Sequence, residues 1–251
     1  MTSKRILILG GTSEAMALAR ALSARPEIDA VLSLAGRTGH PVLPPIAHRI
    51  GGFGGVEGLV AYLKDNAVSA IIDATHPFAA QMTRNAAQAC ETLGVPRLVF
   101  TRPAWQAGDG DHWINVADTE AAVDALGEAP RKVFLTVGRL SLPAFRRAPQ
   151  HHYLMRSIDA PDLADRPPKL DLILARGPFD GAAERDLMKA HRVDVIVTKN
   201  SGGSATDAKL AAARDLGLPV IMIDRPIMPD SRIVYDLDNV MDFINTHRIA
   251  P

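Results

Sequence analysis

The sequence predicts an α/β fold whose mainly parallel sheets are covered by helices on both faces, with the chain divided into two halves of similar size. Short apolar runs alternate with helical patterns along the chain, and this rhythm is typical of consecutive βαβ units. The alternation breaks once, over residues 101–111, which contain a proline, four Gly or Asp residues and no clean period. We interpret that segment as the connection between the two halves.

The first half is expected to begin with a strand. The run Ile6-Leu7-Ile8-Leu9 follows Met1–Arg5 directly, and it is too short for the core of a signal peptide. An alanine- and leucine-rich helix over 13–24 comes next, and strand and helix patterns then recur. We expect further strands over 30–34, 46–50, 70–73 and 97–100, and further helices over 56–66 and 79–93.

The second half repeats the same order of patterns. Strands are expected over 113–116, 132–136, 170–174, 194–197 and 219–223, with one more strand ending at 154–155. Helices are expected over 119–126, 181–191, 206–216 and 236–247. The sequence therefore predicts an N-terminal domain over 1–101 and a C-terminal domain over 102–251.

Composition and charge exclude several classes of protein. Lys+Arg and Asp+Glu both number 28, and without a basic excess or a basic block we expect no nucleic-acid partner. No apolar run approaches the ~18–20 residues that span a bilayer, so we expect no membrane contact and a cytoplasmic location. The one cysteine, Cys90, cannot form an internal disulfide and is expected to be a buried apolar residue.

Several catalytic motifs are absent. The sequence lacks the G-x-x-x-x-G-K-[ST] loop of nucleotide triphosphatases and the G-x-S-x-G elbow of acyl hydrolases. It also lacks H-E-x-x-H, and the adjacent pair His151-His152 would point to opposite faces of a strand. We therefore expect no metal site.

The turn after the first strand is a candidate phosphate site, because ligands of open α/β sheets bind beyond the carboxyl ends of the strands. It reads Gly10-Gly11-Thr12-Ser13-Glu14-Ala15. Glycines let the backbone approach a phosphate, and the helix start favours an anion. The middle glycine of the dinucleotide fingerprint is replaced by Thr12, so a plain turn capped by Thr12 or Ser13 is the alternative.

The loop after the second strand, Gly36-Arg37-Thr38, distinguishes between the two nicotinamide cofactors. NAD enzymes place an acidic residue at this point, whereas an arginine suits the 2′-phosphate of NADP. No acidic residue lies between Val31 and Arg49, so the loop favours NADPH. Taken alone, Arg37 could equally be a solvated surface residue.

Two further loops of the first half are candidates. Gly51-Gly52-Phe53-Gly54-Gly55 would allow close approach of a phosphate, a nicotinamide or a flat substrate, or would form a mobile turn. Asp73-Ala74-Thr75-His76-Pro77-Phe78-Ala79 follows the fourth strand. His76 could orient a substrate carboxylate or act as an acid. The alternative is that Asp73 only caps the turn and His76 only satisfies buried backbone.

Basic residues of the second half lie at or near strand ends. They are Arg139, Arg156, Arg176 and Lys199. If they converge, they would form a receptor for a polyanion, although each arginine could instead be separately solvated. Lys199, followed by Asn200-Ser201-Gly202-Gly203, could hold a carboxylate or donate a proton.

Together these segments resemble the precorrin-6A reductase family of cobalamin (corrin) biosynthesis. The resemblance runs from the first strand to about Pro226, and residues 73–79 and 198–203 are its most specific parts. It is carried by the segments 10–15, 35–37, 51–55, 73–79, 136–139, 175–179 and 198–203.

The resemblance implies an oxidoreductase that uses NADPH to reduce one double bond of the precorrin-6A macrocycle, giving precorrin-6B. It implies two Rossmann-like three-layer αβα domains, the first binding NADPH and the second the tetrapyrrole, with the active site in the cleft between them. We expect a monomer or a weak homo-oligomer. The alternatives are an NADP-dependent reductase of another polyanionic substrate, or a non-catalytic module that binds NADPH or a tetrapyrrole.

The resemblance also assigns roles to individual residues. His76 and Lys199 are the candidate catalytic residues. The expected cofactor contacts are Gly10, Gly11, Thr12, Ser13, Glu14, Gly36, Arg37, Thr38, Gly52, Phe53, Gly54 and Thr75. The expected substrate contacts are His76, Pro77, Phe78, Arg139, Arg176, Lys199, Asn200, Ser201 and Gly202.

Overall fold

The computed structural model describes residues 5–36 and 42–247 and divides the chain into two compact units. The first unit comprises the chain up to Pro103 together with the segment from Ile227 onward, and the second unit is the continuous segment Ala104–Pro226. Each unit contains a six-stranded sheet in which every strand pair is parallel. The predicted fold class is confirmed.

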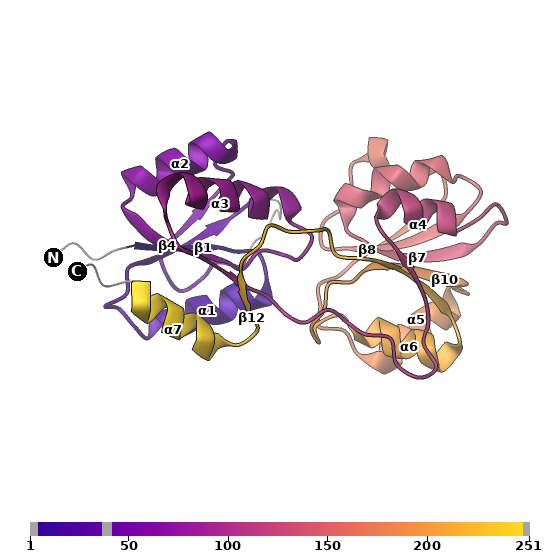
Figure 1. Ribbon diagram of the computed structural model, residues 1–251. Helices are drawn as coiled ribbons and strands as arrows, with labels where there is room; N and C mark the ends of the chain where they lie inside the picture. The colour runs from indigo at the N-terminus through magenta and orange to yellow at the C-terminus, as the bar shows by residue number, and fades with distance from the viewer. Residues whose placement is uncertain (1–4, 37–41, 248–251) are drawn as a thin grey trace. The chain divides into compact units, whose positions relative to one another are not determined.

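The sheet of the first unit has the strand order β12-β5-β4-β1-β2-β3 (Figure 1). Helices α1 and α7 cover one face and α2 and α3 cover the other (Figure 1). The elements are β1 (Arg5–Leu9), α1 (Ser13–Ser23), β2 (Ala30–Leu34), β3 (His48–Ile50), α2 (Gly55–Asp65), β4 (Val68–Asp73), α3 (Ala80–Leu93), β5 (Arg97–Phe100), β12 (Arg232–Val234) and α7 (Leu237–His247).

Strand β1 shows why this sheet needs helices on both faces. Ile6 and Ile8 pack with α1 and α7, whereas Leu7 and Leu9 pack with α2 and α3, since successive side chains of a strand point to opposite faces. All four side chains are buried. Cys90 of α3 belongs to the second of these cores and is buried, and this burial raises the pKa of its thiol to about 11. It is the buried apolar residue that the sequence predicts.

The sheet of the second unit has the order β6-β11-β10-β7-β8-β9. Helices α5 and α6 cover one face, and α4 lies on the other (Figure 1). The elements are β6 (His112–Val116), α4 (Thr119–Ala125), β7 (Lys132–Thr136), η1 (Arg139–Arg147), β8 (His152–Ser157), η2 (Leu163–Asp165), β9 (Leu170–Leu174), α5 (Gly181–Ala190), β10 (Val195–Lys199), α6 (Ala208–Leu216) and β11 (Pro219–Ile223).

The domain boundary predicted from the sequence is wrong at the C-terminus. The predicted helix over 236–247 exists as α7, but it packs in the core of the first unit, through Val240, Phe243 and Ile244. Strand β12, which the sequence analysis does not predict, pairs with β5 at the edge of the first sheet. A strand of three residues is too short to show a period, and helix periodicity does not indicate which sheet a helix covers. The second domain therefore ends at Pro226 and not at residue 251.

Parallel pairing brings the predicted loops of each unit to one edge of its sheet. In the first unit, the loops after β5, β4, β1, β2 and β3 follow the carboxyl ends of adjacent strands. In the second unit, the loops after β11, β10, β7, β8 and β9 do the same. Each edge is described by itself below.

Candidate functional site

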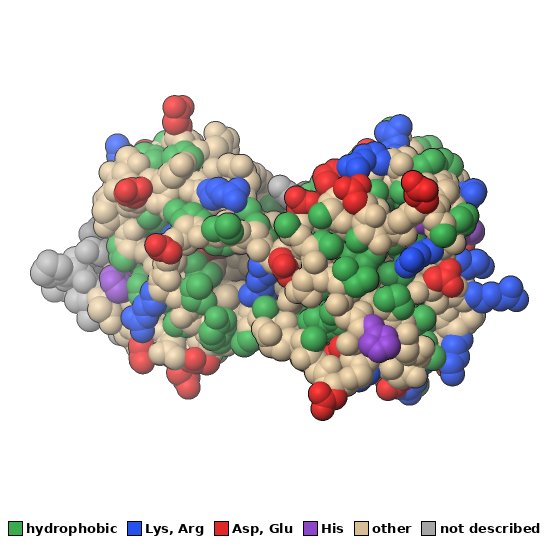
Figure 2. Space-filling model, turned by 45° about the vertical axis from the view of Figure 1, so that its right-hand side comes forward, with side chains coloured by type: hydrophobic (Ala, Val, Ile, Leu, Met, Phe, Trp, Pro, Cys, Tyr) green, Lys and Arg blue, Asp and Glu red, His purple; other side chains and the backbone are tan. Residues whose placement is uncertain are grey.

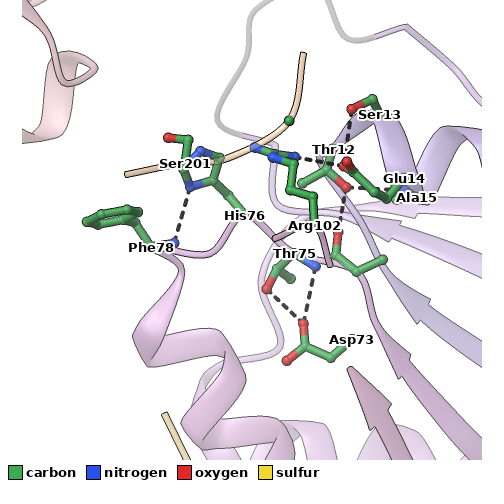
Figure 3. Close-up of polar contacts among 12 residues, drawn as sticks. Thr12, Ser13, Glu14, Ala15, Asp73, Thr75, His76, Phe78, Arg102 and Ser201 are labelled. Carbon is green, nitrogen blue, oxygen red and sulfur yellow. Dashed lines mark hydrogen bonds and ion pairs between the residues drawn. The ribbon is translucent and has the colours of Figure 1, made fainter. Parts of the chain in front are cut away.

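The turn after β1 is held in place by the side chain of Thr12. Thr12 is the N-cap of α1, and its Oγ1 accepts from the backbone N–H of Ala15 at 3.2 Å. The same hydroxyl donates to the carbonyl of Ala74 at 2.8 Å and so ties the turn to the end of β4 (Figure 3). Because this hydroxyl is already used, a ligand at the turn would meet the backbone and not the Thr12 side chain.

Gly11 supplies the conformation that the turn requires. Its φ of +118° lies in the region that side chains rarely adopt, and a Cβ placed there would have nothing within 4 Å. The glycine is therefore required by its backbone angle and not by crowding. An open backbone beside the start of a helix suits a phosphate.

Glu14 forms an ion pair that the sequence analysis does not predict. Its Oε2 lies 2.7 Å from Nη1 of Arg102, which extends toward the start of α1 (Figure 3), and it also accepts from Ser13 Oγ at 3.1 Å. Burial raises the pKa of Glu14, but its own N–H, Arg102 and Ser13 outweigh that effect, so the pKa is lowered. The carboxylate stays ionised, and the Arg102 guanidinium balances its charge.

Asp73, the last residue of β4, orients Thr75. Its Oδ1 accepts from the Thr75 N–H at 3.2 Å and from the Thr75 hydroxyl at 2.7 Å (Figure 3). Its Oδ2 lies 3.8 Å from Nη1 of Arg97, and the two side chains are 1% and 6% exposed. The Asp73 carboxylate is thus buried and contacts only residues of the first unit, whereas Thr75 lies at the sheet edge where a ligand would bind.

His76 is fixed by the turn in which it lies. Its Nδ1 accepts from the backbone N–H of Phe78 at 3.2 Å (Figure 3), and the two rings lie 5.9 Å apart. Since Nδ1 accepts, the neutral ring carries its proton on Nε2. Pro77 and Phe78 complete this turn, and α3 begins at Ala80.

Arg49 stabilises the glycine-rich loop after β3. It donates to the carbonyls of Gly51 and Gly52, both at 2.9 Å, and its guanidinium lies 4.0 Å from the ring centre of Phe53. The ring also makes an edge contact with Tyr62 at 5.1 Å. These contacts anchor both sides of the loop. They also place the Phe53 ring against Arg49 and Tyr62.

The loop after β2 lies at the same edge. Gly36 has a φ of +72°, and a Cβ there would lie 3.1 Å from Ile50. Arg37 and Thr38, predicted to hold the 2′-phosphate, lie outside the described residues.

In the second unit, Lys199 is the last residue of β10, and the glycine-rich loop 200–206 follows it directly. Burial lowers the pKa of its ammonium. Arg225 donates from Nε to the carbonyl of Asn200 at 3.0 Å and from Nη2 to the carbonyl of Ser201 at 3.1 Å. Gly202 and Gly203 have φ values of +70° and +75°, so this backbone path requires glycine.

Asn200 differs from its predicted role as a substrate contact. Its Oδ1 accepts from the N–H of Trp105 at 2.8 Å, and its Nδ2 donates to the carbonyl of Trp105 at 3.1 Å. The residue is 7% exposed. Both polar atoms of the amide are therefore bound within the unit, a pairing across 95 positions that no local pattern indicates.

The three other basic residues predicted at strand ends of the second unit differ in their surroundings. Arg139 follows β7 as the first residue of η1, and Arg176 follows β9, so both lie at the carboxyl edge of the sheet with Lys199. Arg156, by contrast, is buried. It pairs with Glu184 and lies 3.5 Å from the ring centre of Phe179. Arg156 is therefore a core ion pair and not part of a polyanion receptor.

Comparison with known proteins identifies the family. The family model described as "Precorrin-6x reductase CbiJ/CobK" matches residues 5–245. The chain belongs to this family. The precorrin-6A reductase of Rhodobacter capsulatus is 49% identical over 98% of both chains, and that of Rhodococcus erythropolis is 53% identical over 92% of this chain and 93% of the relative. The cobalt-precorrin-6A reductase of Priestia megaterium is 31% identical over 88% of this chain and 90% of the relative.

A solved structure agrees with this assignment. The structure titled "CobK precorrin-6A reductase" matches with a TM-score of 0.92 and 49% identity, covering 99% of this chain and 98% of that one. The chain is thus an oxidoreductase of the precorrin-6x reductase family, and it has that structure's fold.

Other features of this precorrin-6x reductase family member concern metals, membranes and charge. Among residues 5–36 and 42–247, no group of three or more His, Cys, Asp or Glu is placed to hold a metal ion. No helix in that part of the chain is long and apolar enough to cross a membrane. On the face shown in Figure 2, basic and acidic side chains are intermixed.

Two arginines of the site could have been found from their position. Arg102 follows β5, which ends at Phe100, and Arg225 follows β11, which ends at Ile223. Both lie just beyond the carboxyl end of a predicted strand, the place where ligand-binding residues are sought. The loop after residues 219–223 is not among the sites predicted from the sequence, and residues 101–111 are predicted only to connect the two halves.

Proposed function

We propose that this chain reduces one ring double bond of precorrin-6A with NADPH, giving precorrin-6B. The observation that carries the proposal is its membership of the precorrin-6x reductase family over residues 5–245. Five relatives named precorrin-6A reductase are 46–53% identical to this chain, whereas three relatives named cobalt-precorrin-6A reductase are 25–31% identical. We therefore propose the metal-free macrocycle as the preferred substrate, acted on in the cytoplasm.

The first unit fits NADPH. Gly11 presents open backbone just before α1, whereas Gly10 packs closely against the Leu32 side chain. The N–H groups and the dipole at the helix start favour a pyrophosphate there. Arg102 balances the charge of Glu14 beside this turn, so the carboxylate does not leave the site repulsive to an anion. Glu14 accepts hydrogen bonds only, which suits a cofactor hydroxyl and not a phosphate.

The other cofactor contacts follow from the same sheet edge. Thr75, held by Asp73, and the backbone of Gly36, Gly52 and Gly54 lie at the loops after β4, β2 and β3. Arg37 and Thr38 are proposed on sequence grounds to bind the 2′-phosphate. When bound, NADPH supplies the hydride that is added to a ring carbon.

The second unit supplies the cations for the carboxylates of the macrocycle. Arg139, Arg176 and Lys199 lie at the carboxyl edge of its sheet, and a guanidinium can bind a carboxylate through two parallel hydrogen bonds. Ser201 and Gly202 add hydrogen-bond donors in the loop after Lys199.

Two side chains can give the proton that accompanies the hydride. His76 can give a proton only as the imidazolium, in which Nδ1 no longer accepts from the Phe78 N–H. Lys199 has an ammonium whose pKa is lowered by burial, which makes it a better acid. We expect His76→Gln or Lys199→Met to lower kcat, and the variant that removes the acid to abolish the alkaline limb of the kcat profile. Profiles of unchanged shape in both variants would instead indicate a water donor.

The function is tested by anaerobic turnover. The chain is mixed with NADPH and either precorrin-6A or its cobalt complex while the nicotinamide absorbance band is followed. Loss of the band with precorrin-6A, slower with the cobalt complex and with NADH, is expected. Tight NADPH binding with no oxidation by either macrocycle would contradict the proposal and favour another polyanionic substrate or a binding module.

A further inference from the structure

The loop 200–206 of the second unit is bonded to both segments by which the chain enters and leaves that unit. The unit runs from Ala104 to Pro226. Trp105 lies next to its first residue and Arg225 next to its last, and both are hydrogen-bonded to the loop. Loops that carry binding residues are ordinarily among the more mobile parts of a protein. Hydrogen bonds from both Trp105 and Arg225 would instead restrict this loop to one conformation.

Trp105 is attached through three hydrogen bonds. The Asn200 side chain accepts from the backbone N–H of Trp105 at 2.8 Å and donates to the Trp105 carbonyl at 3.1 Å. The backbone of a neighbouring strand would pair with Trp105 in the same way. The Trp105 indole Nε1 donates to the carbonyl of Gly203 at 2.8 Å. The start and the middle of the loop are thus fastened to one residue.

Lys209 adds a contact at the far end of the loop. Its Nζ donates to the carbonyl of Thr206 at 2.5 Å and lies 4.5 Å from the centre of the Trp105 ring. The side chain is 2% exposed. When it is protonated, a lysine head group over the face of an indole is attracted to the ring. Trp105 therefore also contacts Lys209, the residue whose Nζ binds the Thr206 carbonyl.

Arg225 fixes the orientation of the peptides next to Lys199. Its planar guanidinium binds two successive carbonyls, those of Asn200 and Ser201. In a trans peptide the carbonyl and the N–H point in opposite directions. The Gly202 N–H, which follows the Ser201 carbonyl, therefore points away from Arg225.

We propose that Trp105, Asn200 and Arg225 are positioning residues, which hold Lys199, Ser201 and Gly202 in the conformation that receives the carboxylates of the substrate. This inference rests on the proposed function and goes beyond it. Asn200 acts through the backbone of Trp105 and not by touching the substrate. The cofactor loops belong to the first unit, so loss of an anchor weakens substrate binding and leaves NADPH binding unchanged.

Three variants test the proposal in the full-length chain. Trp105→Phe keeps a ring beside Lys209 and removes only the bond to Gly203, Asn200→Ala removes the two bonds to Trp105, and Arg225→Lys keeps the charge but cannot span both carbonyls. With one net hydrogen bond changing an equilibrium about 5-fold, we expect KM for precorrin-6A to rise about 5-fold in Trp105→Phe and Arg225→Lys. In Asn200→Ala we expect a rise of about 10- to 30-fold.

The KM for NADPH should stay unchanged in all three variants, a split that a general loss of stability would not produce. Trp113→Phe is the matched control. Trp113 lies on β6 and packs in the same core as Trp105, so the same substitution there should leave both KM values unchanged. Hydrogen exchange provides a second measurement, and the amides of 201–206 should exchange faster in the three variants than in Trp113→Phe.

The outcomes separate this inference from the proposed function. If the unmodified chain does not oxidise NADPH with precorrin-6A, the proposed function fails and the inference fails with it. If the unmodified chain turns over but the folded variants keep its KM for precorrin-6A, only the inference is overturned. Equal rises of both KM values, or unchanged exchange at 201–206, would overturn it as well.

Discussion

Gly58, in the first turn of α2, has no room for any side chain. A Cβ at this position would lie 1.7 Å from the carbonyl oxygen of Phe53. In an ordinary helix interior, Gly→Ala stabilises by about 1 kcal/mol. Here we expect Gly58→Ala to displace the 51–55 loop and to destabilise the protein by about 1–3 kcal/mol. The loss of stability is measured as the free energy of unfolding in urea.

Gly181→Ala is the matched control for that substitution. Gly181 also lies in the first turn of a helix, α5, and a Cβ there would have nothing within 4 Å. We expect it to leave stability unchanged or slightly raised. Equal effects of the two substitutions would show that the contact between Gly58 and Phe53 does not restrict position 58.

Lys209 should make stability depend on pH in the alkaline range. Burial and, secondarily, Arg156 lower its pKa from 10.5 to about 7, whereas Glu184 and Asp207 oppose the shift. Between pH 7 and 10.5 the unfolded chain binds this proton and the folded chain does not, so this lysine makes stability rise with pH, by at most about 1.4 kcal/mol per pH unit.

Lys209→Met removes that titration. We therefore expect the free energy of unfolding of the unmodified chain to rise, relative to that of Lys209→Met, as the pH is raised from 7 to 10. The measurement is urea unfolding at several pH values in this range. Curves for the two proteins that run parallel from pH 7 to 10 would contradict a lowered pKa at this position.

Asn200 shows what residue-level reasoning could and could not predict. Its place in a glycine-rich loop at a strand end is visible in the sequence and correctly locates it at the sheet edge. Its partner is the backbone of Trp105, far away in the chain, and only the fold brings the two together. The same is true of Arg102 and Glu14.

At the level of elements, the bounds of a strand could be predicted where the whole strand is buried and therefore apolar. Strands β2 and β7 carry mainly apolar residues on both faces because both faces are covered, and the predicted bounds are those observed. Strand β8 runs from His152 to Ser157. Its ends are polar, so the sequence pattern indicates a strand only at its apolar centre. The 3₁₀ segment η1, which contains Pro143, has no 3.6-residue period to recognise.

Helix α7 is the element whose prediction was right in kind and wrong in place. It returns to the first unit and inserts Val240, Phe243 and Ile244 into the core shared with α1. Ile244 is fully buried. We expect Ile244→Ala to cost about 2–5 kcal/mol, measured by thermal or urea unfolding.

Ile227→Ala provides the comparison for Ile244→Ala. It makes the same change near the start of the same C-terminal segment, at a residue that is 90% exposed, and it should have little effect on stability. Similar losses in the two variants would contradict the placement of α7 in the first core. A loss confined to Ile244→Ala supports a first unit assembled from both ends of the chain.

At the scale of the whole molecule, the chain passes between its two units twice, at 103–104 and at 226–227. The sequence predicts the first passage, because residues 101–111 lack periodicity. It does not predict the second, because no comparable break precedes β12. Each unit has its own parallel sheet and core, and this separation allows the two ligands to be assigned to different units by experiment.

Hydrogen exchange with each ligand tests that assignment. If NADPH binds the first unit, it should protect the amides of 10–15, 51–55 and 74–79 and leave 199–206 unchanged. Precorrin-6A, added without NADPH, should protect 199–206 together with the segments around Arg139 and Arg176, because these carry the proposed carboxylate contacts. Protection by NADPH confined to the second unit would reverse the proposed roles of the two units. Protection of 10–15 and 51–55 by precorrin-6A as well as by NADPH would show that the ligand sites are not divided between the units. Shared protection at 74–79 would not show this, because His76 is also a candidate proton donor to the macrocycle.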